Sequence, residues 1–179
     1  MSSNLLSHHL KTLESAGLVR RTPSEADGRR TYIRLNSEVL EAMVPKASSR
    51  ARRVLFVCTH NSARSQLAVA IWNRHSSVPS ASAGTHPVDA IHPGAVAAAD
   101  RRALPLRPST PAHLDNVLER GDLIVAVCDN AHEELPRAFD RIHWSIPDPV
   151  RTASRTAFDH TIDALTTRIE RLAPTLQST

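Results

Sequence analysis

The pattern of apolar and polar positions changes at residue 53. From there on, apolar runs of strand length alternate with segments of helical periodicity. The runs predict strands at 53–58, about 80–84, 122–127 and 141–145, and the segments between and after them predict helices at about 63–75, 92–103, 111–119, 130–138 and 154–173. Such alternation favours an α/β fold in which a four-stranded parallel sheet carries helices on both faces.

The first 35 residues have a different pattern. A helix is expected from Ser2 or Ser3 to about Ala16, with Leu6, Leu10 and Leu13 at helical spacing and therefore facing a core. A short strand at 18–21, a polar turn at 22–30 and a returning strand at 31–35 should follow. On the helix, Ser3, Ser7, His8 and Lys11 fall on the side opposite the leucines.

A short helical stretch at 37–44 and a segment rich in Pro, Ser and Arg at 45–52 complete the front piece. We therefore expect a small domain at 1–44, a linker at 45–52 and a larger domain at 53–179. Of the net charge of +4, all lies in residues 1–52, with nine Lys and Arg against five Asp and Glu. This excess indicates either a polyanionic partner for the front piece or simply a solvated basic face.

Composition excludes several classes of protein. No apolar run approaches the roughly 20 residues of a membrane helix, and the N-terminus lacks the apolar core of a signal peptide, so we expect a cytoplasmic protein. Cys58 and Cys128 cannot form a disulfide framework or a four-cysteine zinc site. Pairing them with His60 and His132 gives no recognised zinc spacing, and we expect no metal and no bound cofactor. Structural burial, redox work and nucleophilic catalysis remain for the two thiols.

The first strand-to-helix junction carries the strongest chemical signal. Cys58 ends a predicted buried strand, and Arg64 follows six positions later inside a new helix. Backbone N–H groups, the helix N-terminus and a guanidinium would then surround one spot and favour a tetrahedral anion there. The same positive field should lower the pKa of the Cys58 thiol. The anion-binding loop comprises Thr59, His60, Asn61, Ser62, Ala63 and Ser65, with Asn61 bracing the loop and Ser65 donating to the sulfur.

The segments Cys58–Ser65, Ser82–Thr85 and Asp148–Pro149 resemble the low-molecular-weight tyrosine phosphatase family and the arsenate reductases built on its fold. The resemblance covers about residues 52–175. It implies that Cys58 is the nucleophile, that Arg64 holds the oxyanion and that Asp148 is the general acid, although an isolated Asp-Pro pair is often only a turn. Protonation by such an acid is needed because the departing oxygen is otherwise a poor leaving group.

Two activities fit this resemblance, arsenate reduction and hydrolysis of phosphotyrosine. Val150 stands where phosphatases of the family commonly have an aromatic residue, which favours arsenate. Cys128 resembles the first resolving cysteine of thioredoxin-coupled arsenate reductases, but Leu135 stands where those enzymes have the next one. Either Cys128 forms a disulfide with Cys58, or a small thiol attacks the Cys58 adduct, or Cys128 is a packed strand-end residue. The reductant implied is external: mycothiol, glutathione or a thioredoxin-type protein.

Residues 2–35 resemble the recognition helix and wing of ArsR-type winged helix-turn-helix repressors. The resemblance implies DNA contacts from Ser7, His8 and Lys11 in the major groove and from Arg29 and Arg30 on the wing. The helices that precede the recognition helix in that family are missing here, so we expect a truncated or misassigned start. No cysteine lies in residues 1–52 to sense arsenic. A third reading is therefore a DNA-binding regulator whose larger domain senses oxyanions without turnover.

Overall fold

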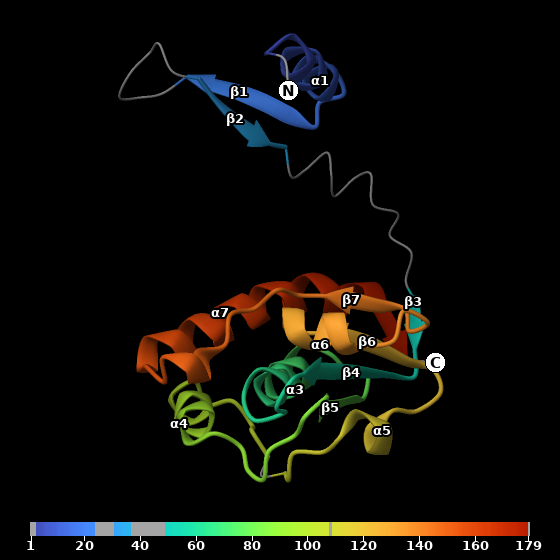
Figure 1. Ribbon diagram of the computed structural model, residues 1–179, viewed down its shortest axis with the longest axis vertical. Helices are drawn as coiled ribbons and strands as arrows, with labels where there is room; N and C mark the ends of the chain where they lie inside the picture. The colour runs from blue at the N-terminus through green and yellow to red at the C-terminus, as the bar shows by residue number, and fades with distance from the viewer. Residues whose placement is uncertain (1–2, 24–30, 37–48, 108, 179) are drawn as a thin grey trace. The chain divides into compact units, whose positions relative to one another are not determined.

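The computed structural model describes residues 3–23, 31–36, 49–107 and 109–178. The chain divides into two compact units, Met1–Ala47 and Ser48–Thr179 (Figure 1). Within the part of the chain described, no helix has the length and apolar content needed to cross a membrane.

The N-terminal unit contains one helix and one hairpin. Helix α1 spans Ser3–Ser15, and strands β1 (Val19–Pro23) and β2 (Thr31–Leu35) pair antiparallel. Gly17, with φ of 70°, ends the helix in the left-handed conformation that glycine adopts without strain. The expected turn beyond residue 23 and the helical stretch at 37–44 lie outside the described residues.

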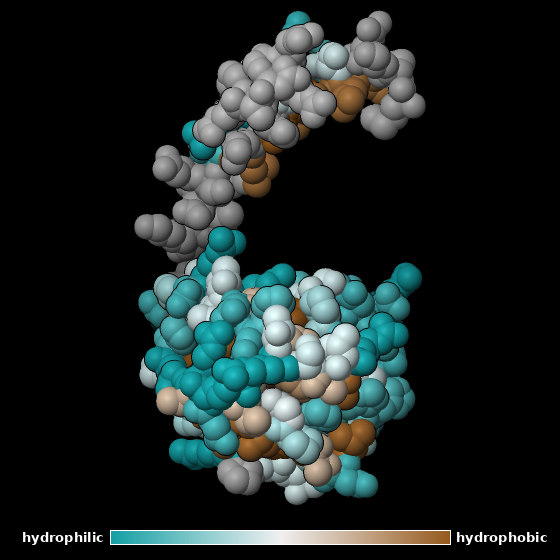
Figure 2. Space-filling view, turned by 90° about the vertical axis from the view of Figure 1, so that its left-hand side faces the viewer, coloured by the Kyte–Doolittle hydropathy of each residue, from teal (hydrophilic) through white to brown (hydrophobic). Residues whose placement is uncertain are grey.

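The leucines of α1 do not face a core, contrary to the prediction from their spacing. Leu6 is 52% exposed and Leu13 is 39% exposed, while Leu10 is partly covered. Hydrophobic residues accordingly lie at the surface of this unit in Figure 2. Helical spacing indicates that one side of a helix is apolar, but not that another element covers that side. A single two-stranded hairpin offers too little surface to cover the apolar side of α1.

The second unit is an α/β fold. Its central strands are β4 (Arg53–Cys58), β5 (Ser80–Gly84), β6 (Asp122–Ala126) and β7 (Arg141–His143). Its helices are α3 (Arg64–His75), α4 (Pro93–Arg101), α5 (Leu114–Val117), α6 (Asp129–Glu134) and α7 (Arg155–Leu172), with short 3-10 turns η1 (Pro149–Arg151) and η2 (Ala173–Thr175).

The four central strands form a parallel sheet in the order β5-β4-β6-β7, which confirms the predicted sheet. From β4 the chain runs to β5 on one side and then crosses to β6 on the other. The carboxyl ends of β4 and β6 therefore flank the point where the strand order reverses, the usual ligand-binding position in open α/β sheets. Cys58 ends β4, and Cys128 follows β6 by two residues.

The core is centred on β4, whose residues from Val54 to Cys58 are all buried. A strand buried on both of its faces needs cover from both sides, and this explains its unbroken apolar run. Phe56 packs against Trp72 of α3 and against Trp144, with ring centroids 5.7 and 5.9 Å away. Trp72 also donates its indole N–H to the carbonyl of Val78 at 2.7 Å, so its one polar atom is satisfied.

Several elements differ from their predicted lengths. The helix expected over 111–119 is only Leu114–Val117, because His113 caps its first turn and Leu118 already adopts an extended backbone. The helix expected over 130–138 ends at Glu134, two residues before Pro136, a residue that cannot continue a helix. Ser49–Ala51, which the sequence analysis placed in the linker, form β3 and pair in parallel with β8 (Leu176–Ser178).

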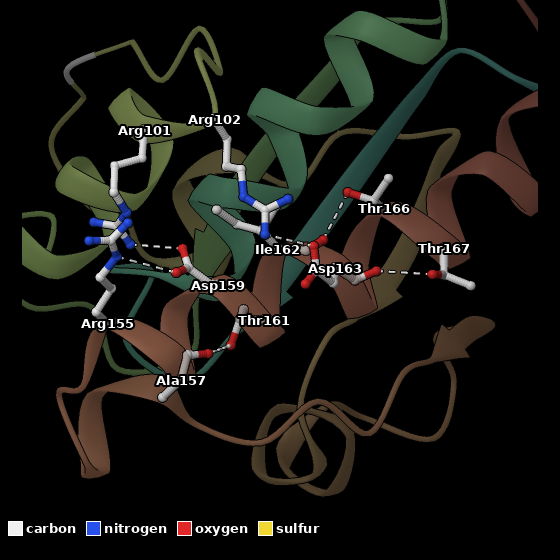
Figure 3. Close-up of polar contacts among 10 residues, drawn as sticks. All are labelled: Arg101, Arg102, Arg155, Ala157, Asp159, Thr161, Ile162, Asp163, Thr166 and Thr167. Atoms are coloured by element: carbon white, nitrogen blue, oxygen red, sulfur yellow. Dashed lines mark hydrogen bonds and ion pairs between the residues drawn. The ribbon is translucent and has the colours of Figure 1, made fainter.

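Helix α7 is fastened to α4 by ion pairs. Asp159 binds Arg101 at 2.8 Å and Arg155 at 3.7 Å, and Asp163 binds Arg102 at 3.0 Å (Figure 3). The hydrogen bond from Arg101 lowers the pKa of Asp159 below its ordinary value. Partly exposed pairs of this kind add little stability each, but they fix how the two helices are aligned.

Candidate active site

The loop after β4 curls back onto the sulfur of Cys58. The backbone N–H of Asn61 donates to Cys58 Sγ at 3.2 Å, and the hydroxyl of Ser65 lies 3.0 Å from the same sulfur. Helix α3 begins at Arg64, after Ala63, whose side chain cannot cap it. The first-turn N–H groups of α3 are therefore left to water or to an anion.

Asn61 braces this loop in a left-handed conformation, with φ of 50°. Its amide nitrogen donates to Ser65 Oγ at 2.8 Å, and its amide oxygen accepts from the backbone N–H of Ala112 at 3.0 Å and from Gln66 at 3.3 Å. Asparagine is among the few residues that tolerate this backbone conformation. The expected roles of Asn61 as a brace and of Ser65 beside the sulfur agree with these contacts.

Gly84, at the end of β5, allows the loop to approach the sheet. A Cβ atom at this position would lie 2.8 Å from the carbonyl oxygen of Thr59 and 3.1 Å from the nitrogen of Asn61. The next residues continue the contact, since Thr85 N–H donates to the carbonyl of Cys58 and His86 N–H to that of Thr59. The segment Ser82–Thr85, singled out in the sequence, is thus the floor on which the loop rests.

Arg64 reaches across to the loop that follows β7. Its guanidinium donates to the carbonyl of Ile146 at 3.1 Å and forms an ion pair with Asp148 at 3.2 Å. The Arg64 side chain is 9% exposed and that of Asp148 is 21% exposed. Asp148 also accepts from the N–H of Val150 and so caps η1. The structure thus brings Asp148 and Arg64 together from positions far apart in the sequence.

The thiol of Cys58 does not have the lowered pKa expected from the sequence. Complete burial is the largest influence and raises its pKa, and the bonds to Ser65 together with the charge of Arg64 offset this only in part. The prediction considered the positive groups of the loop but not the loss of water around the sulfur, nor the pairing of Arg64 with Asp148.

Cys128 lies beside the same loop. Its sulfur is 3.5 Å from the hydroxyl of Thr59, and both cysteines are free and buried. Asp129 follows it at the start of α6, bound by Ser145 at 3.0 Å and by His143 at 2.8 Å. The hydrogen bond from Ser145 is the main reason that the pKa of Asp129 is lowered.

A pocket of about 640 Å³ opens over these groups. It contains part of the loop (Thr59, His60, Arg64), the start of α6 (Cys128, Asp129, Asn130) and the segment around Asp148 (Ser145, Ile146, Pro147, Asp148, Val150, Arg151). Its described lining contains no Phe, Tyr or Trp side chain, and the imidazole of His60 is the one aromatic ring among these lining residues. The volume is that of a small-molecule site and is larger than a single tetrahedral anion requires.

Other expected site residues are placed as follows. Ser62 and Ala63 are buried in the loop, and the backbone carbonyl of Ser62 accepts from the backbone N–H of His92 at 2.9 Å. Ser7, His8 and Lys11 are exposed on α1, whereas Arg29 and Arg30 lie outside the described residues. Among residues 3–23, 31–36, 49–107 and 109–178, no group of three His, Cys, Asp or Glu side chains is arranged to hold a metal ion.

Sequence reasoning missed the residues that support Asn61 from behind. Gln66 is only 4% exposed, and Ser109 donates to its amide oxygen at 3.0 Å. A polar residue directly after Arg64 and Ser65, on a helix predicted to pack on the sheet, was an available signal for Gln66. Nothing in the pattern near Ser109 indicates that its loop returns to the site.

The second unit is similar to known proteins in sequence and fold. An arsenate reductase of Bacillus cereus is 30% identical over 136 residues, covering 69% of this chain and 96% of its own length. The crystal structure of an arsenate reductase from Archaeoglobus fulgidus, 30% identical, superposes with a TM-score of 0.59 and covers 67% of this chain and 98% of its own.

The tyrosine phosphatase Wzb from Escherichia coli K30, 23% identical, shares the fold with a TM-score of 0.62 over 69% of this chain and 96% of its own. The sequence profile described as "Low molecular weight phosphotyrosine protein phosphatase" matches residues 53–179. The chain therefore belongs to the low molecular weight phosphotyrosine protein phosphatase family.

Proposed function

We propose that this protein is a cysteine-dependent arsenate reductase, with Cys58 as nucleophile, Arg64 as oxyanion clamp and Asp148 as general acid. The observation that carries the proposal is the pairing of Arg64 with Asp148 in a pocket lined by the loop that follows Cys58, whose buried sulfur is bound by Asn61 N–H and lies against Ser65. We propose that arsenate reduction and phosphate ester hydrolysis, two of the activities named among similar proteins, both begin with this arrangement.

Arsenate binds at the N-terminus of α3 and replaces Asp148 as the anionic partner of Arg64. The guanidinium fork matches two oxygens of a tetrahedral anion, and the free N–H groups of the first turn of α3 bind the others. Release of Asp148 leaves its carboxyl beside the oxygen that must depart. Anion binding and the placing of the acid are in this way one event.

In the first chemical step the Cys58 sulfur bonds to arsenic and one As–O bond breaks. The oxygen leaves as water after it receives a proton from Asp148, which takes up that proton from solvent once Arg64 has released it. Since burial raises the pKa of Cys58 in the unoccupied site, the thiol proton moves to the arriving arsenate dianion, which then carries one negative charge beside the thiolate. Total charge in the pocket is unchanged by this transfer.

In the second step a thiolate attacks the Cys58 sulfur, the S–As bond breaks, and its electron pair stays with arsenic, which leaves as arsenite. We propose Cys128 as the attacking thiol, because it lines the pocket and its sulfur lies against Thr59 of the same loop. The product is a Cys58–Cys128 disulfide, which an external thiol such as mycothiol, glutathione or a thioredoxin-type protein reduces. Direct attack by a small thiol is the alternative route.

The walls of the pocket favour arsenate over phosphotyrosine. A phenyl ring packs best on aromatic walls, but the described lining contains no Phe, Tyr or Trp side chain. Its apolar residues Ile146, Pro147 and Val150 lie beside the polar residues Asp129, Asn130, Ser145 and Arg151. The relatives that are 30% identical and named arsenate reductase support the same choice. Hydrolysis of aryl phosphates is the second candidate, supported by the shared fold of Wzb.

A single-turnover experiment tests the proposal. Reduced protein is freed of external thiol and mixed with arsenate, and arsenite and the disulfide are measured by chromatography and mass spectrometry. We expect about one arsenite per chain and one Cys58–Cys128 disulfide, and no arsenite from Cys128→Ser until a small thiol is added. Steady hydrolysis of p-nitrophenyl phosphate without any thiol-dependent arsenite would instead identify a phosphatase.

For the N-terminal unit we propose DNA binding. The exposed side chains of Ser7, His8 and Lys11 on α1, followed by an antiparallel hairpin, support this assignment. The test is retention of labelled promoter DNA in a mobility shift assay at increasing salt. Binding should weaken as salt rises, because contacts with phosphates release counterions, and Lys11→Ala should reduce that dependence.

A further inference from the structure

A chain of hydrogen bonds runs from the surface to the sulfur of Cys58. Ser109 binds Gln66, Gln66 binds Asn61, and Asn61 binds Ser65, which lies against the sulfur. The residues come from three separate parts of the sequence: Ser109 from the loop before α5, Asn61 from the loop after β4, and Ser65 and Gln66 from α3.

The contacts fix the direction in which each group donates. The amide oxygen of Asn61 accepts from the backbone N–H of Ala112, which can only donate, so the nitrogen of Asn61 faces Ser65. Because Gln66 also meets the oxygen of Asn61, Gln66 must present its NH₂ group there and its own oxygen to Ser109. The hydroxyl of Ser65 then accepts from Asn61 and has its single proton free for the sulfur.

We infer that Gln66 and Ser109 are positioning residues that set the direction of this chain, so that the Ser65 proton points at the Cys58 sulfur. The inference rests on the proposed role of Cys58 as nucleophile. Were the amide of Asn61 reversed, its oxygen would take the Ser65 proton and the thiolate would lose that donor. Gln66 acts together with the Ala112 N–H against this reversal, since it occupies the second acceptor site on the oxygen of Asn61, and Ser109 holds Gln66 in the orientation that does so.

The measurable consequence is the acidity of Cys58. A hydrogen bond from Ser65 favours the thiolate, so diverting that proton should raise the pKa of Cys58. The other charged or titratable groups facing Cys58 are Arg64 on α3 and Cys128 after β6, with Asp148 bound to Arg64. None of them is changed in the variants used here.

The experiment follows alkylation by iodoacetamide against pH in the full-length protein, without arsenate. Trypsin cuts at Arg53 and Arg64, and separately at Arg120 and Arg137, so mass spectrometry measures Cys58 and Cys128 on different peptides. Gln66→Glu places a carboxylate against the oxygen of Asn61 and should move the Cys58 midpoint upward by about one pH unit. Gln66→Met, which only removes the bond, should move it less.

Ser109→Ala tests the outer end of the chain at an exposed position that folding tolerates, and it should raise the midpoint by a smaller amount than Gln66→Glu. Ser109→Thr, which keeps the hydroxyl, should restore the wild-type value. The matched control is Ser80→Ala, which removes a serine bond of nearly equal length, 2.9 Å, to the amide oxygen of Asn73 away from the site. It should leave the midpoint unchanged.

A Cys58 midpoint in Ser109→Ala equal to that in Ser80→Ala would overturn the inference, as would an unchanged midpoint in folded Gln66→Glu. These outcomes are independent of the proposed function, because alkylation requires no arsenate. Failure to reduce arsenate with the midpoint shifts intact would reject the reductase and leave the positioning role standing.

Discussion

The two cysteines lie at the carboxyl ends of neighbouring parallel strands, Cys58 as the last residue of β4 and Cys128 two residues beyond β6, and they have different surroundings. Cys58 ends β4 and is followed by a loop whose Asn61 N–H and Ser65 hydroxyl both contact the sulfur. Cys128 leads directly into α6, and the hydroxyl of Thr59, at 3.5 Å, is its side-chain contact. The sheet brings both thiols to the same edge, but only the sulfur of Cys58 is contacted by the loop after β4 through both a backbone N–H and a serine hydroxyl.

The largest expected difference between the two comes from replacing each with serine. Cys58→Ser should reduce both arsenate reduction and p-nitrophenyl phosphate hydrolysis by about 10³-fold or more, since the covalent adduct cannot form. Cys128→Ser should leave phosphate ester hydrolysis close to wild type and abolish arsenite release in the absence of a small thiol. Equal losses of ester hydrolysis in the two variants would erase the distinction.

The next effect concerns the two aspartates of the pocket. Asp148→Asn removes the proposed proton donor and should lower kcat by about 10²- to 10³-fold. Asp129→Asn removes a carboxylate on the Cys128 side, where Ser145 and His143 already bind it, and should cost far less. Steady-state kinetics across pH on both variants distinguishes them. A larger loss in Asp129→Asn would mean that the general acid lies on the Cys128 side of the pocket and is not Asp148.

A smaller effect is expected from the floor of the Cys58 loop. Gly84→Ala would set a methyl group 2.8 Å from the carbonyl of Thr59 and displace the loop. We expect a cost of about 1–3 kcal/mol in the free energy of unfolding and a fall in activity of up to about 10²-fold. Chemical denaturation and kinetics measure the two. Activity unchanged in Gly84→Ala would mean that the loop need not lie so close to the sheet.

The smallest effect is on pH dependence. Burial raises the pKa of the Cys58 thiol, so the reactive thiolate is scarce at neutral pH and increases as pH rises. Alkylation of Cys58 in the unoccupied protein should therefore have a midpoint above that of a free cysteine. The same raised pKa adds stability that is present below the ordinary thiol pKa and lost as pH rises through the folded value. A midpoint below that of free cysteine would contradict the burial argument.

Much of the site was predictable because its central part is continuous in sequence. A buried strand, a short loop and a helix follow one another there, and the main site residues all lie within residues 58–65. Their spacing in the sequence therefore carries information about their geometry. The parallel sheet was predictable for a similar reason, since β4 is apolar throughout and needs cover on both faces.

The rest depends on how distant loops fold. The pairing of Arg64 with Asp148 joins α3 to the loop after β7, and the contact of Ser109 with Gln66 depends on the loop before α5. Neither leaves a periodic signal in the sequence. The predicted direction of the change in the Cys58 pKa was wrong for a related reason. Positive groups can be identified in a sequence, whereas the burial of one sulfur cannot.

The pairing of β3 with β8 has a mechanical consequence. Ser49 lies opposite Leu176 and Ala51 opposite Ser178, so the entry of the chain into the second unit and its C-terminal end are joined side by side and run in the same direction. A pull on residue 48 against residue 178 would load these hydrogen bonds together, in shear, instead of peeling them apart singly. The C-terminal strand therefore resists a force applied at the start of the second unit, on the N-terminal side of β4 and Cys58.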